Sequence, residues 1–250
     1  MPKQSFSRIG VIPWMPLFGL LLLFLCFSAP ASGSPLVLNT DDEYPLSSPD
    51  GTGFEDKILK EAFRRIGKEI KIIHLPSERA LVNANAGIDD GNFVRIAGLE
   101  KTYPNLIRVP EKIWMFEFAV FSKKGDLKIK DWESLKPFDV GIITGWKILE
   151  ANVLGTRSLT KVNDSEALFN LLLKDRADLV IFDRLQGQVL LKNKGLSEIK
   201  SLKPNLAKQD MFVYLHRRHA ELVAPLVKAL QTMKQDGTFQ RLIDSVLYPK

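Results

Sequence analysis

One acidic residue stands where α/β proteins commonly bind small molecules. Asp183 directly follows Leu179–Phe182, an uninterrupted apolar run that predicts a short buried strand. Ligands of α/β sheets bind at the carboxyl ends of the strands, so this carboxylate is a candidate ligand contact. Asp is equally favoured as the cap of a helix, and a helix is predicted to follow at once. The sequence leaves both roles open.

Other polar residues near predicted strand ends are further candidates. The acidic run Asp-Asp-Glu at 41–43 follows the first predicted strand and could meet a cation, although a solvated loop is the preferred interpretation. His74 ends another strand with no second histidine nearby, which favours a structural role. Arg79 opens a predicted helix beside the expected cleft. Because a cation in the first turn opposes the helix dipole, Arg79 is a candidate ligand contact.

Several kinds of catalytic site are missing from the sequence. It contains no nucleophilic serine motif, no His/Cys set with metal-ligand spacing and no glycine loop of the kind that cradles phosphate. The single cysteine, Cys26, lies in an apolar segment that we expect to be removed, which leaves no disulfide or thiolate metal site. The sequence therefore predicts no catalytic residue, no metal and no cofactor.

The charge pattern argues against nucleic-acid binding. The formal net charge is +6, and it falls to +4 when Lys3 and Arg8 are subtracted with the predicted signal. The remaining charges alternate in sign, and the basic tract at 216–219 (His-Arg-Arg-His) is only four residues long. We interpret that tract as a solvated turn, because a phosphate-binding surface needs a longer basic patch with interleaved aromatic residues.

The first 33 residues have the pattern of an export signal. A basic start is followed by the uncharged run Leu17–Phe27 and then by small residues. Pro13 and Pro16 leave a helical stretch shorter than the ~20 residues that cross a bilayer, which favours cleavage over a permanent anchor. We expect cleavage near Ala31–Gly33 and a periplasmic protein.

The chain after the signal predicts an α/β unit. Leu36–Leu38 and Glu69–Leu75 are predicted strands, and apolar residues recur every four positions between them, from Phe54 to Ile66. A second helix is expected from Ser77 to Gly87. Strands and helices that alternate with short loops are typical of a layered α/β fold.

A second α/β unit is predicted to interrupt the first. Its strands are Asp139–Ile143 and Leu179–Phe182, and Ile113–Phe121 and Met211–Leu215 are expected to cross between the units. The predicted divisions are the signal at 1–33, lobe 1 at 34–116, lobe 2 at 117–210, and the rest of lobe 1 at 211–250. Two crossings predict a hinge, and a hinge between lobes predicts a cleft that opens and closes.

Six segments in this order resemble the family 3 periplasmic solute-binding proteins, the polar amino-acid receptors of ABC importers. They are Tyr44-Pro45, Gly51–Gly67, Ala86–Gly91, Val140–Trp146, Ala177–Asp183 and Gln235–Ile243, and the likeness spans residues 35 to 247. The resemblance implies a two-lobed type II periplasmic-binding-protein fold with the second lobe inserted in the first. It also implies a monomer that captures a small solute in the cleft and delivers it to a membrane permease.

The resemblance also assigns roles to individual residues. Asp183 matches the carboxylate that pairs with the ligand's α-ammonium group, and Tyr44 matches an aromatic residue that stacks on the ligand. The turn Gly145-Trp146-Lys147 matches the helix N-terminus that holds the ligand carboxylate.

Three positions depart from the family pattern. Trp146 replaces the usual Ser or Thr, so the indole either stacks on the ligand or packs as a core aromatic residue. Lys101 replaces an Arg and cannot form a bidentate clamp on a carboxylate, and Gly98 replaces a Thr. Arg95 could supply the guanidinium instead. These departures leave a modified amino acid, another small carboxylate or an aromatic solute as possible ligands.

The sequence therefore predicts a solute-binding protein for an ABC-type importer, without enzymatic turnover. The expected ligand is a small polar or carboxylate-bearing solute, such as an amino acid or a derivative. Two alternatives remain open. Relatives with this fold dehydrate prephenate-like acids, and a sensor that reports its ligand to a membrane partner would have the same pattern.

Overall fold

The helices and strands that the structure describes lie between Ser34 and Tyr248. The computed structural model describes residues 1, 2, 10 and 34–249, and the contacts divide the chain into Met1–Gly33 and Ser34–Lys250. Most of the predicted signal, at 3–9 and 11–33, lies outside the described residues. None of the described helices is both long enough and apolar enough to cross a bilayer.

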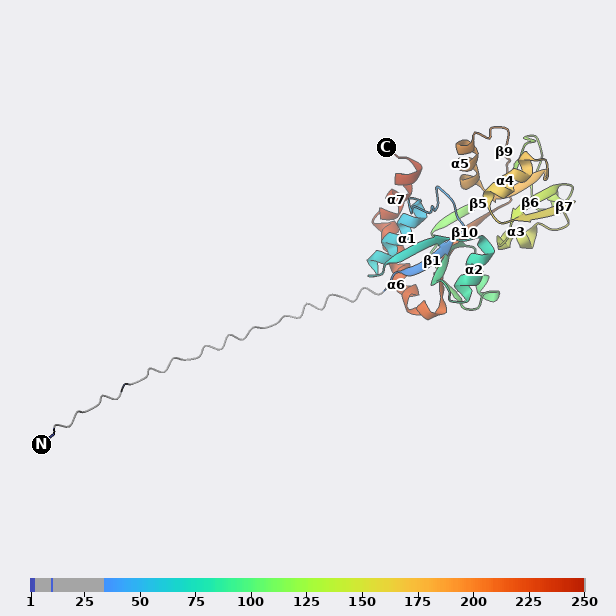
Figure 1. Cartoon of the computed structure of the whole chain (residues 1–250). Coiled ribbons are helices and arrows are strands. Elements are labelled where there is room, and N and C mark those ends of the chain that lie inside the picture. Colours follow the sequence, from blue (N-terminus) through green and yellow to red (C-terminus); the bar gives the residue numbers. More distant parts are fainter. Residues whose placement is uncertain (3–9, 11–33, 250) are drawn as a thin grey trace. The chain divides into compact units, whose positions relative to one another are not determined.

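One group of elements, here called lobe 1, is formed by both ends of the range from Ser34 to Tyr248 (Figure 1). Its strands are β1 (Leu36–Thr40), β2 (Ile70–His74), β3 (Gly91–Arg95) and β4 (Leu106–Arg108). Its helices are α1 (Phe54–Arg65), α2 (Ser77–Asn85), α6 (Val223–Gln235) and α7 (Thr238–Leu247). Short 3₁₀ helices at Leu99–Lys101 and Arg217–Leu222 complete it.

The other group, lobe 2, lies between them in sequence. Its strands are β6 (Asp139–Ile143), β7 (Ser158–Val162), β8 (Leu179–Asp183) and the short β9 (Lys200–Ser201). Its helices are α3 (Lys147–Asn152), α4 (Ser165–Leu173) and α5 (Arg184–Lys194), with a 3₁₀ turn at Glu133–Leu135. The predicted strands Asp139–Ile143 and Leu179–Phe182 are confirmed, and the latter extends to Asp183.

Two long strands join the lobes. β5 (Trp114–Ser122) and β10 (Ala207–His216) pair in antiparallel fashion, with Trp114 opposite Met211 and Phe118 opposite Ala207. The sheet runs through this pair in the order β2-β1-β3-β10-β5-β8-β6-β7. The two predicted crossings are therefore adjacent strands. The lobe boundaries at 116/117 and 210/211 fall inside the pair and stay a prediction.

Helix α1 shows how an amphipathic pattern builds the core. Its residues Phe54, Ile58, Leu59, Ala62 and Phe63 are fully buried, as the four-residue spacing predicted. Acidic residues occupy its first turn and basic residues its last, which suits the helix dipole. The helix packs against α6 and α7, whereas α2 packs on β1 and β3.

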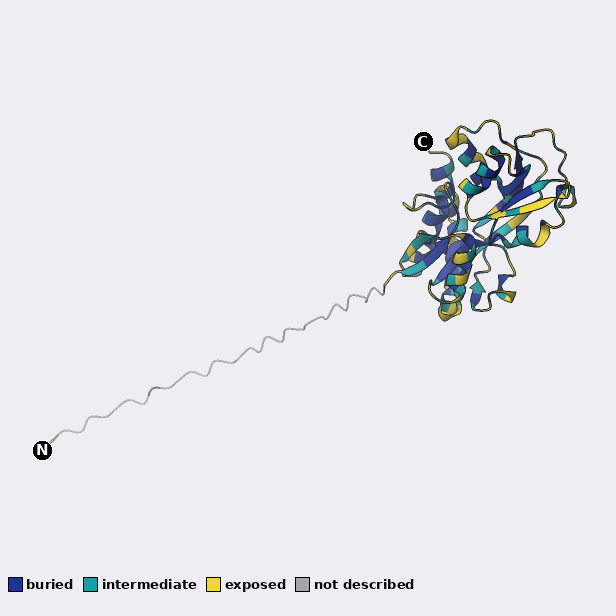
Figure 2. Cartoon of the chain, turned by 45° about the vertical axis from the view of Figure 1, so that its right-hand side comes forward, coloured by how far each residue is buried: buried dark blue, intermediate teal, exposed yellow. Residues whose placement is uncertain are grey.

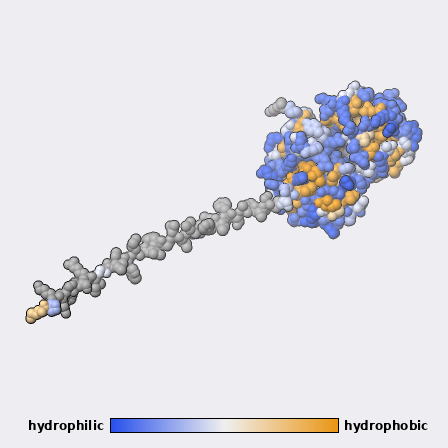
Figure 3. All heavy atoms as spheres, in the orientation of Figure 1, coloured by the Kyte–Doolittle hydropathy of each residue, from blue (hydrophilic) through white to orange (hydrophobic). Residues whose placement is uncertain are grey.

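Burial follows the layers. Figure 2 shows buried central strands surrounded by helices with exposed outer faces, and the edge strand β7 is largely exposed. Hydrophilic residues cover most of the face in Figure 3, and hydrophobic residues gather there in a few patches.

Sequence patterns did not predict β3, β4 or β7, because these strands are short or mixed in polarity.

A glycine in α5 permits a close helix–sheet contact in lobe 2. A Cβ atom on Gly187 would lie 2.4 Å from the Phe121 ring of β5. We expect Gly187→Ala to lower the free energy of unfolding by about 1–3 kcal/mol, because the core has no room for the methyl group. Urea unfolding measures this effect.

Gly125→Ala is the matched control. A Cβ atom on Gly125 would meet only Lys200 Cγ, at 3.6 Å, so its unfolding free energy should stay within about 0.5 kcal/mol of the parent value. Equal losses in the two variants would contradict the packing argument.

Candidate functional site

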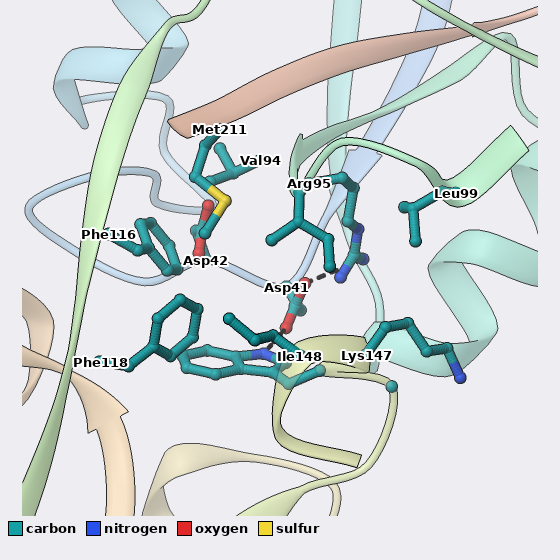
Figure 4. A pocket seen from close by; sticks show the side chains of 13 residues that line it. Asp41, Asp42, Val94, Arg95, Leu99, Phe116, Phe118, Lys147, Ile148 and Met211 are labelled. Carbon is teal, nitrogen blue, oxygen red and sulfur yellow. Dashed lines mark hydrogen bonds and ion pairs between the residues drawn. The ribbon is translucent and has the colours of Figure 1, made fainter. Parts of the chain in front are cut away.

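Two neighbouring cavities lie between lobe 1 and lobe 2, and Asp41 and Asp42 line both of them. The inner cavity, seen in Figure 4, has a free volume of about 30 Å³. The outer cavity has about 390 Å³ and takes its walls from residues 41–44, 47–49 and 74–76 of lobe 1 and 143, 163–165 and 182 of lobe 2. Both are candidate parts of one interlobe binding site.

Asp41 is at the centre of the inner cavity (Figure 4). It follows β1, and its Oδ1 atom lies 3.0 Å from the guanidinium of Arg95. Its Oδ2 atom accepts a 2.7 Å hydrogen bond from the indole Nε1 of Trp146 in lobe 2. One carboxylate therefore binds a cation of its own lobe and a donor of the other lobe.

Arg95 ends β3, is 5% exposed and lines the inner cavity. It donates to Ser77 Oγ at 2.6 Å, to the Ser77 carbonyl at 3.2 Å and to Asn92 Oδ1. With Asp41, these acceptors engage every nitrogen of the guanidinium. The structure thus places Arg95 in the cavity as predicted but pairs it with protein groups, and its contact with a ligand stays a prediction.

Trp146 fills the inner cavity from lobe 2. Its ring stacks on Phe182, with centroids 5.0 Å apart and planes 11° apart. The ring centroids of Phe116 and Phe118, both in β5, each lie 5.8 Å from the centroid of the same indole. The side chain is 7% exposed. Of the two sequence interpretations, the core aromatic role is the one that the structure displays, with a hydrogen bond across the lobes in addition.

The residues on either side of Trp146 also touch lobe 1. Gly145 has φ +91°, and a Cβ atom on it would lie 2.5 Å from the backbone nitrogen of Glu78. Lys147 Nζ donates to Glu78 and, at 2.9 Å, to Glu150. Burial alone would lower the pKa of Lys147, but these two carboxylates outweigh burial and raise it.

Asp183 lines neither of these two cavities. It is 1% exposed and caps α5, since Oδ1 accepts from the Gln186 N–H at 3.0 Å. Oδ2 accepts from the Glu117 N–H at 3.2 Å. Burial raises the pKa of Asp183 to about 6, although these hydrogen bonds oppose the shift. The structure shows the helix-cap role, and the ligand contact implied by the resemblance stays a prediction.

The remaining predicted site residues lie at or beyond the rim. Tyr44 is 45% exposed and lines the outer cavity. Arg79 and Lys101 are exposed and line neither cavity. The predicted contacts of Tyr44, Arg79 and Lys101 with a ligand stay predictions.

The acidic run at 41–43 is not a solvated loop, and that interpretation is wrong. Asp42 is 3% exposed, and both carboxylate oxygens of Glu43 accept from Ser165 Oγ, at 2.6 and 2.7 Å. Gln186 donates to Asp42 at 3.3 Å and accepts from the Glu43 N–H at 2.9 Å. The signal in the sequence was the position of three acids immediately after a buried strand, at the edge where ligands bind.

A second acid is buried beside Asp42. Glu55 is fully buried, and among the described residues neither of its oxygens nor Asp42 Oδ2 has a hydrogen-bond partner. Burial raises the pKa of both carboxyls well above the ordinary value, and repulsion adds to the shift, from Asp41 for Asp42 and from Asp42 for Glu55. A proton held between the two groups relieves both effects, because like charges in a buried site cannot both ionise.

Most side-chain contacts between the lobes share one polarity, and the Glu43 N–H that donates to Gln186 is an exception. Lobe 1 supplies the carboxylates of Asp41, Asp42, Glu43 and Glu78, and lobe 2 supplies donors from Trp146, Lys147, Ser165 and Gln186. These donors stand at or near the N-termini of α3, α4 and α5, where helix dipoles favour negative charge. The lobes therefore meet through electrostatically complementary surfaces.

Comparisons with known proteins identify the fold. No family model matches the chain. An uncharacterized protein of Shewanella oneidensis is 28% identical over 241 residues, which cover 88% of this chain and 89% of the relative.

Solved structures show the same architecture. A histidine kinase sensor domain with similarity to periplasmic binding proteins has a TM-score of 0.76 and 15% identity, and covers 87% of this chain and 97% of its own. An amino acid ABC transporter substrate-binding protein from Streptococcus pneumoniae, bound to L-arginine, has a TM-score of 0.71 and 18% identity. The match covers 85% of this chain and 94% of that protein. The GluR0 ligand-binding core of Nostoc punctiforme, in complex with L-glutamate, has a TM-score of 0.71 and 21% identity, with 86% and 100% covered.

The chain has a type II periplasmic-binding-protein fold. The predicted fold class is confirmed, because these matches extend over most of the chain.

Gly145 tests the contact between the lobes. We expect Gly145→Ala to separate them, since a methyl group would meet the backbone of α2 and the left-handed φ disfavours alanine by about 1 kcal/mol. Small-angle X-ray scattering should then give a larger radius of gyration.

Gly155→Ala is the matched control for backbone strain. Gly155 also has a positive φ, of +67°, but its Cβ atom would meet only Lys136, at 3.6 Å. Its radius of gyration should remain that of the parent. A compact Gly145→Ala protein would contradict the predicted contact.

The Asp42–Glu55 pair predicts a pH dependence of stability. Both carboxyls bind a proton more tightly when folded, so the free energy of unfolding should fall as pH rises above about 4, where unfolded carboxyls ionise. Glu55→Gln replaces the shared proton with a permanent N–H donor. We expect this variant to gain about 1–3 kcal/mol at pH 8 and little at pH 4.5, measured by urea unfolding.

Glu133→Gln is the control, because the Glu133 side chain is 75% exposed. This variant should leave the free energy of unfolding unchanged at both pH 8 and pH 4.5. The residual slope in Glu55→Gln comes from the other buried carboxyls with raised pKa, including Asp183. A Glu55→Gln protein that is less stable at pH 8 would refute the shared proton.

Proposed function

We propose that this protein is an extracytoplasmic solute-binding protein that captures one small molecule between lobe 1 and lobe 2. The outer cavity carries the proposal, because its walls come from both lobes and the paired strands β5 and β10 join those lobes. A molecule that touches both walls stabilises the state in which the lobes are together. The fold shared with the S. pneumoniae binding protein supports this function.

In this proposal the monomeric protein is exported, binds without turnover and delivers its solute to an ABC-type permease. The open lobes admit the solute, and the permease recognises the form in which the lobes have closed. The polar contacts between Asp41 and Trp146 and between Glu43 and Ser165 define that form.

A sensor is the second candidate. The histidine kinase sensor domain has the TM-score of 0.76 given above, and a sensor would use the same closure to signal rather than to transport. Uptake of a radiolabelled ligand by cells that lack the protein separates the two: lost uptake supports the receptor, and unchanged uptake supports the sensor.

No observation on the described residues favours a dehydratase. Such an enzyme needs a general acid and basic groups that hold substrate carboxylates. Arg95 is paired with Asp41, and Lys147 with Glu78 and Glu150. These cations are engaged by the protein itself.

A ligand screen tests the proposed function. Amino acids, organic acids, amines, sugars and prephenate are added to the protein, and the melting temperature is recorded. A ligand at 100 times its dissociation constant should add about 2.7 kcal/mol, or a shift of roughly 5–10 °C. Conversion of a bound compound into product would contradict binding without turnover, and no shift with any compound would contradict solute capture.

A further inference from the structure

The inner cavity has no room for a solute while Trp146 is in place. Its free volume of about 30 Å³ corresponds to two or three water molecules, at about 10–15 Å³ each. The indole is held there by the Phe182 stack and by Asp41. The outer cavity, with about 390 Å³, is therefore the part of the cleft that can take a small organic molecule.

The outer cavity has an acidic lining. Asp41, Asp42, Glu43 and Asp164 face it, and no Lys or Arg is among its lining residues in the described part of the chain. Arg95, which lines the inner cavity, neutralises the negative charge of Asp41. The partners of Glu43 are neutral, namely Ser165 and Gln186, and Asp164 binds the Ala167 N–H of α4. Burial raises the pKa of Glu43, and Lys194, the cation that opposes this shift, is paired with Glu166.

A second observation concerns a buried acceptor on this wall. Asp42 is 3% exposed and lines both cavities, and among the described residues its Oδ2 atom has no partner except the proton that it shares with Glu55. A carboxylate oxygen has two lone pairs, so an N–H donor brought by a ligand would fill the one that is left.

The groups that would hold a ligand carboxylate are already engaged. Arg95 is bound by Asp41, Ser77 and Asn92. The Gly145 N–H, at the start of α3, donates to Glu150 at 3.1 Å. At the start of α4, Glu43 and Asp164 supply the negative charge that the helix dipole attracts.

We propose that the outer cavity binds a small organic cation, an amine or guanidinium compound that carries no carboxylate. This inference rests on the proposed function and narrows its ligand class. The cationic head lies among Glu43, Asp164 and Asp42, and the apolar part of the ligand lies against Tyr44 and Phe182, which line the same cavity. An α-amino acid adds a carboxylate to this acidic wall, and its binding is weakened by repulsion.

Matched pairs of compounds test the proposal. Agmatine and L-arginine, putrescine and L-ornithine, and cadaverine and L-lysine each differ by the carboxylate alone. Isothermal titration calorimetry is performed on the protein expressed from the full chain. At least one of these amines should bind, at least tenfold more tightly than its matched amino acid.

Variants locate the bound amine. Glu43→Gln and Asp164→Asn should each weaken binding of the amine at least tenfold. Asn remains a good helix cap, so Asp164→Asn preserves α4 even if Glu43→Gln disturbs the lobe contact. Glu133→Gln removes the same charge from an exposed site in lobe 2 and should leave the affinity unchanged.

The outcomes separate this inference from the proposed function. Amino acids that bind as tightly as the amines, or an amine whose affinity neither Glu43→Gln nor Asp164→Asn changes, would overturn the inference and leave a solute-binding protein. Binding of neutral or anionic compounds alone would do the same. Absence of any ligand across the wider screen would overturn both.

Discussion

Asp41 lies between a guanidinium of its own lobe and an indole N–H of the other, and both contacts are shielded from water. A carboxylate removed from water is stable only when its charge is paired and its lone pairs accept hydrogen bonds. Arg95 supplies the charge, and Ser77 and Asn92 fix the orientation of its guanidinium. Because Arg95 holds Oδ1 of Asp41, the direction of the other carboxylate oxygen, Oδ2, is fixed. That oxygen in turn fixes the position of Trp146 and of the start of α3.

The same principle extends along the cleft. Carboxylates that follow β1 meet donors near the starts of three lobe 2 helices, so the protein supplies its own anions to positions that would otherwise attract an anionic ligand. Charged groups in such contacts give orientation more reliably than they give stability, because desolvation offsets much of the attraction. The contact between the lobes is therefore specific in geometry, and its strength depends on what else enters the outer cavity.

Buried acids are concentrated at the junction of the lobes. Asp42 and Glu55 lie together in lobe 1, and Asp183 caps α5 on the lobe 2 side. The apolar framework tolerates them because β5, β8 and β10 provide a rigid, largely buried support. The apolar core is continuous through both lobes. Among the described residues, the buried side-chain oxygens without a hydrogen-bond partner belong to Asp42 and Glu55.

The sequence by itself determined the longer strands and helices and their order, but not β3, β4 or β7. The apolar run before Asp183 and the four-residue spacing of α1 depend on near neighbours in the chain, and each predicted its structure correctly. The cap role of Asp183 was one of two roles that the sequence left open. The pairing of Asp41 with Trp146, 105 residues apart, and of Glu43 with Ser165, 122 residues apart, was decided only by the tertiary structure. These contacts depend on the strand order through β10 and β5 and on the docking of one lobe against the other, which no local pattern encodes. For that reason residues 41–43 resembled a solvated loop in the sequence and form the wall of the cleft in the fold.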